Sequence, residues 1–312
     1  MAAPTLPNGQ PWPGVSVIIP AYNYAHYLPL TLDSVFRQNY PALELIVVDD
    51  GSTDATAEVV KTYGDRIRYV HQTNAGLSAA RNTGIRTATC DYLCFLDADD
   101  TLNLGMLHEA IRTFVSLPDE FAVVAFPAQP VDPVGKLLPV KQLLPLRGRE
   151  ITGREIILKS RFPTGGVVKR AVFAECGFYD TSLRSSEDRD IWIRISARRK
   201  IYLHQERMIF YRRHPNSMSR NTARMKANMA RVIRKARHDQ RVSRREIFYW
   251  LRVWSFYQFQ GAWMYWDEKR RWPAVRDMLV SLLLWPWFPD HNELNEPTLF
   301  RLRALAWFLR RH

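Results

Sequence analysis

The stretch Tyr92-Leu93-Cys94-Phe95-Leu96-Asp97-Ala98-Asp99-Asp100 decides the fold prediction for this chain. Its first five residues are apolar and have the length of a buried strand, and three carboxylates follow within four residues. Carboxylates gathered at a strand end repel one another, and a hard divalent cation bound between them removes that cost. An alternative is a solvated turn in which Asp99 or Asp100 caps the next helix.

Similar strand ends occur earlier in the chain. Residues 15–20 and 45–48 are predicted to be buried strands, and the second runs into Asp49 and Asp50. A third strand, near residues 67–71, is followed by a loop and a helix. Strand and helix alternate four times in the first 115 residues, which predicts an α/β protein with a parallel, doubly wound sheet. Ligands of such sheets bind beyond the carboxyl ends of the strands, where these acids fall.

Four motifs together make the chain resemble the family 2 glycosyltransferases. They are Pro20-Ala21-Tyr22-Asn23, Val48-Asp49-Asp50-Gly51-Ser52-Thr53-Asp54, Gly76-Leu77-Ser78-Ala79-Ala80-Arg81-Asn82 and Asp97-Ala98-Asp99, in the order and spacing of that family. The resemblance covers roughly residues 14–220. It implies the GT-A fold, a Rossmann-like and mostly parallel sheet flanked by helices.

The implied activity is inverting, metal-dependent transfer of a sugar from a nucleotide sugar to a hydroxyl acceptor. A UDP-sugar is the expected donor, although guanosine and thymidine donors occur on the same motifs. The acceptor would be a glycan or a lipid-linked sugar, in cell-surface polysaccharide or glycolipid synthesis. The alternative is a non-catalytic nucleotide-sugar-binding or membrane scaffold protein with the same fold.

The resemblance also implies which residues bind the nucleoside. Pro20, Tyr22, Asn23 and Asp50 would line the nucleoside pocket, with Asp49 beside them. The Asp50 carboxylate would accept a hydrogen bond from the imide N–H of uracil.

At the phosphates, the resemblance places Asp97 near the ribose or a metal-bound water, and Asp99 as a ligand of Mg²⁺ or Mn²⁺. The cation would act as a Lewis acid on the leaving nucleoside diphosphate. Arg81 would contact the nucleotide, or it would be a structural helix residue. His214 is expected at the metal or the diphosphate.

Two further segments are interpreted in the same way. Residues 211–219 resemble a loop that closes the catalytic domain, with Arg212 or Arg213 on the phosphates, and the alternative is a solvated basic loop. Residues 164–170 resemble a strand between donor and acceptor sites. Its glycines let the backbone approach a ligand closely, or they mark a bend.

The stretch Ser185-Ser186-Glu187-Asp188-Arg189-Asp190-Ile191-Trp192-Ile193-Arg194 is predicted to open a helix and to supply the catalytic base. A carboxylate at a helix start can take the proton from an acceptor hydroxyl. We assign Asp188 as this base and Glu187 as an acceptor-side or supporting acid, with Asp190 as the second candidate. The alternative is structural, because the spacing from Ser185 to Asp188 also fits a capping box.

The C-terminal part of the chain is basic and aromatic. Residues 212–245 hold 12 Lys and Arg against one acid, while the whole chain has a formal charge of +13. One face of a helix there would be apolar (Met225, Met229, Val232, Ile233, Ala236) and the other basic (Arg224, Arg231, Arg234, Lys235, His238, Arg241). Eight of the ten Trp follow residue 249. We consider binding to an anionic membrane, internal packing and nucleic-acid binding, and expect no nucleic acid because no binding module is recognisable.

Composition is consistent with a large globular enzyme. With 312 residues and 46% hydrophobic content, the chain can bury a core of domain size. Cys90, Cys94 and Cys176 lack metal-ligand spacing and indicate free thiols in a reducing compartment. We therefore expect a cytoplasmic protein, peripheral on the inner membrane face. Residues 1–13 are expected to be a loose arm, 14–220 the catalytic domain and 221–312 a helical region.

Overall fold

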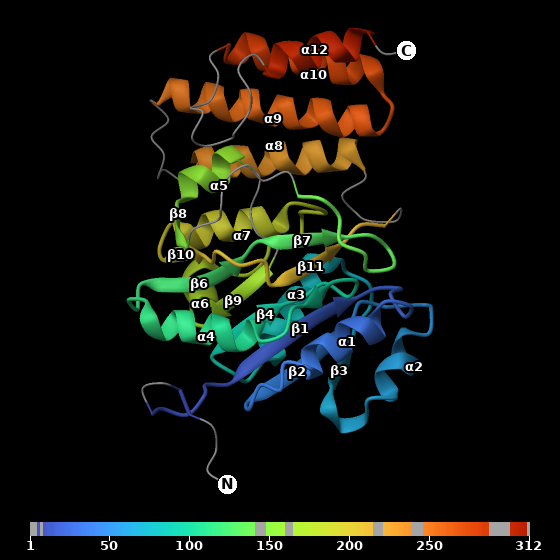
Figure 1. Ribbon diagram of the computed structural model, residues 1–312, viewed down its shortest axis with the longest axis vertical. Helices are drawn as coiled ribbons and strands as arrows, with labels where there is room; N and C mark the ends of the chain where they lie inside the picture. The colour runs from blue at the N-terminus through green and yellow to red at the C-terminus, as the bar shows by residue number, and fades with distance from the viewer. Residues whose placement is uncertain are drawn as a thin grey trace. The chain divides into compact units, whose positions relative to one another are not determined.

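The computed structural model describes residues 5–6, 9–140, 148–159, 165–214, 221–238, 246–286 and 300–310 (Figure 1). The chain divides into two compact units. The first comprises residues 1–153 and 162–214, and the second comprises residues 154–161 and 215–312. Each unit contains its own cluster of buried hydrophobic side chains.

Among the described residues, eight strands of the first unit form one sheet in the order β3-β2-β1-β4-β9-β6-β10-β8 (Figure 1). Strands β3, β2, β1 and β4 are parallel, as the sequence predicted. Strand β9 runs antiparallel to both of its neighbours, and β8 is antiparallel to β10. The strands are β1 Val15–Ala21, β2 Leu43–Asp49, β3 Arg68–His71, β4 Tyr92–Phe95, β6 Phe121–Phe126, β8 Arg149–Ile151, β9 Gly165–Lys169 and β10 Lys200–Leu203.

A small second sheet, in the order β5-β11-β7, is built from Thr101–Leu102, Ile209–Arg212 and Ala128–Val131 in the described part of the chain. Strand β5 follows the acidic turn after β4, and β11 leads to His214. The pairing of β5 with β11 therefore brings the end of the acidic turn and residues 212–214 together.

Helices cover both faces of the main sheet. The helices of this unit are α1 Leu28–Phe36, α2 Thr56–Lys61, α3 Leu77–Thr87, α4 Met106–Ser116, α6 Val172–Cys176 and α7 Glu187–Ser196. Alternate residues of β1, such as Val17, pack with α1 and α4 in the main core cluster. Ile18 points to the other face, where α3 lies so close that a Cβ at Gly84 would fall 2.3 Å from the Ile18 Cγ2 atom.

The register of the parallel strands determines where the acidic residues lie. Asp49 at the end of β2 is paired with Ala21 at the end of β1. The Leu96 N–H donates to the Ile18 carbonyl, so Asp97 follows at the same edge of the sheet. The carboxyl ends of β1, β2 and β4 thus meet at one edge, as expected for a parallel sheet.

The segment before Gly14 is less detached than predicted. Leu6 is buried in the core cluster, and Trp12 packs edge-on against Tyr40. The Tyr40 hydroxyl donates to the carbonyl of Pro13 at 2.7 Å. Burial of these apolar side chains explains why the described part of this arm is not loose.

The second unit is helical. Its helices are α5 Gly153–Lys159, α8 Thr222–His238, α9 Ile247–Asp267, α10 Arg271–Leu284 and α12 Phe300–Arg310 (Figure 1). Aromatic side chains of α9 and α12 fill its core, and Trp266 stacks on Phe308 with ring centroids 4.4 Å apart. The internal-packing interpretation is confirmed for these aromatics. Within the ranges described, no helix combines the length and apolarity needed to cross a membrane.

Helix α8 has the predicted amphipathic character. Met229, Val232 and Ile233 are buried, whereas Arg231 and Arg234 are exposed. Arg241 lies outside the described residues. An unpredicted buried ion pair joins Lys226 of α8 to Asp277 of α10. A Cβ at Gly261 of α9 would fall 2.6 Å from the Lys226 Nζ atom, so this glycine makes room for the pair.

Candidate active site

The acidic turn after β4 is held by groups from β11 and the residues that follow it. The Arg212 N–H donates to Asp100 Oδ1 at 2.9 Å, and His214 Nε2 lies 2.8 Å from Asp99 Oδ2. The next long helix, α4, begins at Met106 after a left-handed Gly105. Neither Asp99 nor Asp100 is its cap, so the capping alternative is wrong.

Negative charge is concentrated in this turn. Burial raises the pKa of Asp99, and the Asp97 carboxylate raises it further, while His214 acts in the opposite direction. The pKa of Asp100 is raised well above its usual value by burial and by Asp99 and Asp97. Both shifts mean that the site favours a bound positive charge.

The pair Asp99 and His214 has the chemistry of a partial metal site. A carboxylate oxygen and an imidazole nitrogen from two elements meet at hydrogen-bond distance, and both groups bind divalent cations such as Mn²⁺. In the described part of the chain, no group of three or more His, Cys, Asp or Glu could hold a metal ion. A cation bound by Asp99 and His214 would need phosphates and water as its other ligands, which Mg²⁺ commonly uses.

Aromatic side chains that we did not predict surround His214. The Tyr24 ring lies edge-on to it at 5.9 Å between centroids, and the Tyr27 ring lies at 5.5 Å. Burial and the nearby carboxylates, led by Asp99, raise the pKa of Tyr24. The only sequence signal for this cluster is the recurrence of aromatics directly after β1.

Arg212 is not available to bind phosphates as we had expected. Its side chain is buried, and its Nε donates to the Asp99 carbonyl at 2.9 Å. One Nη donates to the Pro133 carbonyl at 3.0 Å. Arg213 is exposed, and the rest of the expected closing loop, residues 215–219, lies outside the described residues.

The residues assigned to the nucleoside lie together at the ends of β1 and β2. Asp50 is buried, and its carboxylate accepts hydrogen bonds from Gln72 Nε2, the Ala75 N–H and the Gly76 N–H, at 2.7 to 2.9 Å. Asp49 accepts from the Ser52 N–H at 2.8 Å. These contacts shape the loops around the site. The hydrogen bond expected between Asp50 and the uracil imide did not suggest this structural role.

The turn after β1 is braced against the turn after β2. Asn23 has a left-handed backbone with φ of 59°, and its side-chain oxygen accepts from the Thr53 N–H at 2.7 Å. The Asn23 N–H in turn donates to Ser52 Oγ at 3.0 Å. Tyr22 is 46% exposed and Pro20 is buried within β1, so of this pair only Tyr22 has a surface free to stack on a base.

Arg81 connects two of the predicted motifs. It is buried in α3, and its guanidinium bonds Asp97 Oδ1 at 2.7 Å and Glu187 Oε1 at 2.6 Å. The same group lies over the Tyr179 ring, 5.4 Å from the centroid. Arg81 therefore joins the acidic turn to the start of α7.

Asp188 lies at the start of α7 and is partly buried. Burial raises its pKa to about 6, Glu187 raises it as well, and Arg81 opposes the shift. Its Oδ1 accepts from the Arg189 N–H at 2.7 Å. Ser186 precedes the helix with a left-handed backbone and makes no side-chain cap bond, and Ser185 Oγ has no partner in the described structure. The capping-box alternative is therefore wrong.

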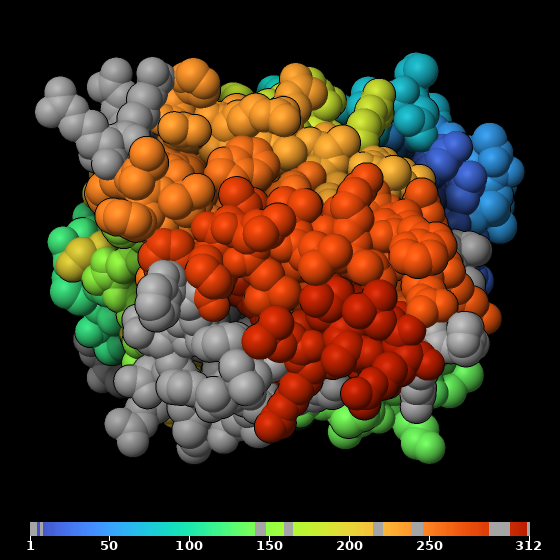
Figure 2. All heavy atoms as spheres, turned by 90° about the horizontal axis from the view of Figure 1, so that it is seen from above, coloured from blue at the N-terminus to red at the C-terminus, as the bar shows by residue number. Residues whose placement is uncertain are grey.

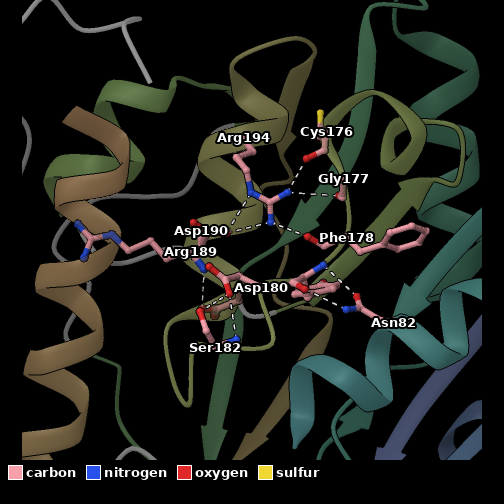
Figure 3. Close-up of polar contacts among 11 residues, drawn as sticks. Asn82, Cys176, Gly177, Phe178, Asp180, Ser182, Arg189, Asp190 and Arg194 are labelled. Carbon is pink, nitrogen blue, oxygen red and sulfur yellow. Dashed lines mark hydrogen bonds and ion pairs between the residues drawn. The ribbon is translucent and has the colours of Figure 1, made fainter. Parts of the chain in front are cut away.

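Asp190 serves a structural purpose (Figure 3). Its carboxylate pairs with Arg194 at 2.9 Å, and Arg194 also donates to the Phe178 carbonyl at 2.8 Å. From α3, Asn82 bonds the backbone N–H and carbonyl of Tyr179, both at 2.9 Å. Asp190 and Asn82 thus fix the loop before α7 from two sides.

Strand β9 packs closely on its neighbour, as the glycines of residues 164–170 indicated. A Cβ at Gly166 would fall 2.4 Å from the Val124 carbonyl oxygen of β6. Thr164 lies outside the described residues. The close approach shown here is to the protein's own backbone.

The chain matches the family described as Glycosyl transferase family 2 over residues 16–177, more than half of its 312 residues. It therefore belongs to that family. It is 30% identical over 224 residues to the uncharacterized glycosyltransferase RP339 of Rickettsia prowazekii, covering 68% of this chain and 67% of that one. It is 41% identical over 112 residues to glycosyltransferase GlyA of Streptococcus pneumoniae, covering 35% of this chain but only 16% of GlyA. Several curated relatives are thus much longer than the matched region.

Solved structures support the same fold. The mannosyltransferase of Pyrobaculum calidifontis, in complex with GDP-Man and Mn²⁺, has a TM-score of 0.63 at 19% identity, covering 95% of this chain and 85% of that one. S. aureus TarS 1-349, in complex with UDP-GlcNAc, has a TM-score of 0.59 at 18% identity, covering 89% and 93%. The predicted GT-A fold is confirmed.

Proposed function

We propose that this protein is an inverting glycosyltransferase that moves a sugar from a nucleotide sugar to a hydroxyl acceptor. The observation that carries the proposal concerns the acidic groups on the two sides of Arg81. On one side lies the acidic turn with Asp97, and on the other the start of α7 with Asp188, whose pKa is raised to about 6. A charged donor and a proton acceptor are the two things that direct displacement at an anomeric carbon requires.

The donor would bind at the ends of β1 and β2. Exposed Tyr22 and the braced turn of Asn23 would receive the base, with Asp49 and Asp50 shaping the pocket floor. Neighbouring folds have been seen with UDP-GlcNAc and with GDP-Man. We favour a uridine donor, which is the commonest in the family.

Asp99 and His214 would hold Mg²⁺ or Mn²⁺ against the diphosphate. When bound, the cation would offset the negative charge that grows on the leaving nucleoside diphosphate. The raised pKa of Asp99 supports this assignment, because a cation would relieve the repulsion from Asp97.

Asp188 would take the proton of the acceptor hydroxyl as its oxygen attacks the anomeric carbon. A general base acts best when its pKa lies near the working pH. Burial has raised the pKa of the Asp188 carboxyl toward neutral pH. Attack from the face opposite the leaving group inverts the configuration at that carbon. Glu187, paired with Arg81, would support the base rather than contact the acceptor.

Thermal stabilisation by ligands tests this proposal. A panel of UDP, GDP, TDP and their sugar nucleotides would be screened with and without Mn²⁺, followed by release of nucleoside diphosphate from the best donor. We expect Mn²⁺-dependent stabilisation and slow donor hydrolysis, which Asp188→Asn reduces by about 10²–10⁴-fold. Donor binding without any turnover, even with glycan acceptors, would favour the non-catalytic scaffold.

We also propose that the second unit binds an anionic membrane on its cytoplasmic side, close to a lipid-linked or glycan acceptor. Basic residues line the exposed side of α8. Helices α9 and α10 leave large apolar side chains in solvent, with Phe248 69% and Leu283 83% exposed. Figure 2 looks onto the surface that α9, α10 and α12 form. Basic and apolar groups on one unit are what an interfacial membrane contact uses.

Sedimentation with phosphatidylglycerol vesicles tests membrane binding. Arg231→Glu with Arg234→Glu and Lys235→Glu should abolish salt-sensitive binding, and Phe248→Ser with Leu283→Ser should weaken the salt-resistant part. A matched control makes the same charge change at exposed Arg37, Lys61 and Lys136. Equal loss in the control would mean that net charge alone governs binding, and no sedimentation of the folded wild type would refute the proposal.

A further inference from the structure

The Arg81 guanidinium lies between two acids and is almost completely buried. Only 5% of Arg81 is exposed, and its ion pairs with Asp97 and Glu187 measure 2.7 and 2.6 Å. Glu187 is also buried. An arginine that binds a ligand needs N–H donors that reach the ligand, whereas here both Nη atoms are engaged by carboxylates. The sequence left Arg81 either as a nucleotide contact or as a structural helix residue, and its two ion pairs favour the second alternative.

Glu187 is the first residue of α7, and Asp188 is the second. Ser186, directly before them, has a left-handed backbone with φ of 60°, a conformation that is unfavourable for a non-glycine residue. Charge-assisted bonds such as the one from Arg81 to Glu187 are among the strongest side-chain contacts. Arg81 therefore anchors Glu187, the residue between the left-handed Ser186 and Asp188.

We propose that Arg81 is a positioning residue of the transfer reaction, which holds Glu187 so that the adjacent Asp188 is oriented and kept free to accept a proton. This inference rests on the proposed function for its catalytic meaning. It also assigns a structural role to Glu187, which forms the ion pair with Arg81.

Electrostatics support the same conclusion. The charged and titratable groups that act on Asp188 include Glu187, Asp97, Arg81 and Tyr179, and its carboxylate also accepts a hydrogen bond from the Arg189 backbone N–H. Glu187 and Asp97 raise the Asp188 pKa, whereas Arg81 lowers it. Without Arg81, two uncompensated carboxylates would face Asp188, which would then keep its proton at neutral pH and could not act as a base.

The test is a ¹³C NMR titration of aspartate side-chain carboxyl carbons in the full chain, with Asp188→Asn identifying the Asp188 signal. We expect a wild-type midpoint near 6. Arg81→Gln should raise the midpoint by about one to three units. Glu187→Gln removes a like charge and should lower it. Arg81→Lys keeps the charge but loses the forked geometry, so its midpoint should fall between those of wild type and Arg81→Gln.

Binding of UDP with Mn²⁺ separates positioning from nucleotide contact. We expect Arg81→Lys and Arg81→Gln to bind UDP like the wild type. On the acidic side of the pH–rate profile, the midpoint for donor hydrolysis should shift together with the NMR midpoint of Asp188. Lost UDP affinity with an unmoved midpoint would overturn the proposal in favour of a nucleotide contact. A lower melting temperature with an unmoved midpoint would make Arg81 merely structural. If Arg81→Gln does not fold, the lower titration midpoint of Asp188 expected for Glu187→Gln still tests the proposal. Shifted midpoints without any turnover would leave this inference standing and refute the proposed transferase function.

Discussion

Replacing Asp188 with Asn should make the protein more stable at neutral pH. Desolvation raises the pKa of the partly buried Asp188 carboxyl to about 6, against 3.8 for an exposed aspartate. A shift of about two units corresponds to about 3 kcal/mol that ionised Asp188 costs the folded state. Asn has almost the same shape and can still accept the hydrogen bond from the Arg189 N–H. The variant should therefore recover about 3 kcal/mol, which raises Tm by roughly 6–12 °C.

The pH dependence gives the sign of the effect. Below about pH 4 the carboxyl is protonated in both the folded and the unfolded chain, so variant and wild type should have equal stability. Between about pH 4 and 6 the unfolded chain loses its proton first, and the wild type loses stability as the pH rises. Above pH 6 the full difference is present. Urea unfolding of both proteins from pH 4 to 8 measures the curve.

Asp190→Asn is the matched control, two residues along the same helix. It breaks a buried ion pair with Arg194, so it should destabilise the protein by about 3–5 kcal/mol. Stability changes of opposite sign for the two variants at pH 7.5 would support the interpretation that ionised Asp188 destabilises the fold while Asp190 stabilises it. A destabilised Asp188→Asn, or a gain that is equal at pH 4 and pH 8, would refute the reasoning.

Three further predictions follow from other contacts. Asp99→Asn should leave the fold intact and abolish Mn²⁺-dependent stabilisation by UDP, and retention of that stabilisation in a thermal shift assay would exclude Asp99 as a ligand. Gly166→Ala should destabilise the protein by about 1–3 kcal/mol in urea unfolding, since its methyl would fall 2.4 Å from the Val124 carbonyl, and a neutral result would mean that β9 shifts freely. Asp277→Asn should cost about 3–5 kcal/mol by leaving the Lys226 ammonium buried without its carboxylate, and a loss below about 1 kcal/mol would show that Lys226 simply deprotonates.

The clustering of the acidic residues could be predicted from sequence because local rules determine it. Parallel strands end at one edge of a sheet, so acids directly after β2 and β4 had to lie near one another. The spacing of Asp190 and Arg194 is the i, i+4 spacing of a helix ion pair, and it carried a structural signal that we did not use.

Contacts between distant parts of the chain could not be predicted. Arg81 and Glu187 are 106 residues apart, and no local pattern marks them as partners. The burial of Arg212 depends on carbonyl groups of residues 99 and 133, which come from other loops. Likewise, the aromatic residues of α9 could be membrane anchors or core residues on sequence alone, and the packing of α10 and α12 on α9 determines which of them are covered.

Helix α5 has a consequence for how this chain folds during synthesis. It grows out of the first unit at Gly153, yet Arg154 pairs with Glu246 at 2.6 Å and Leu158 packs in the core of the second unit. A seven-residue helix is not stable alone in water. At ribosomal rates, α9 leaves the ribosome several seconds after α5. During that time α5 has no partner from its own unit, and a chain cut after His214 would keep it in that state permanently.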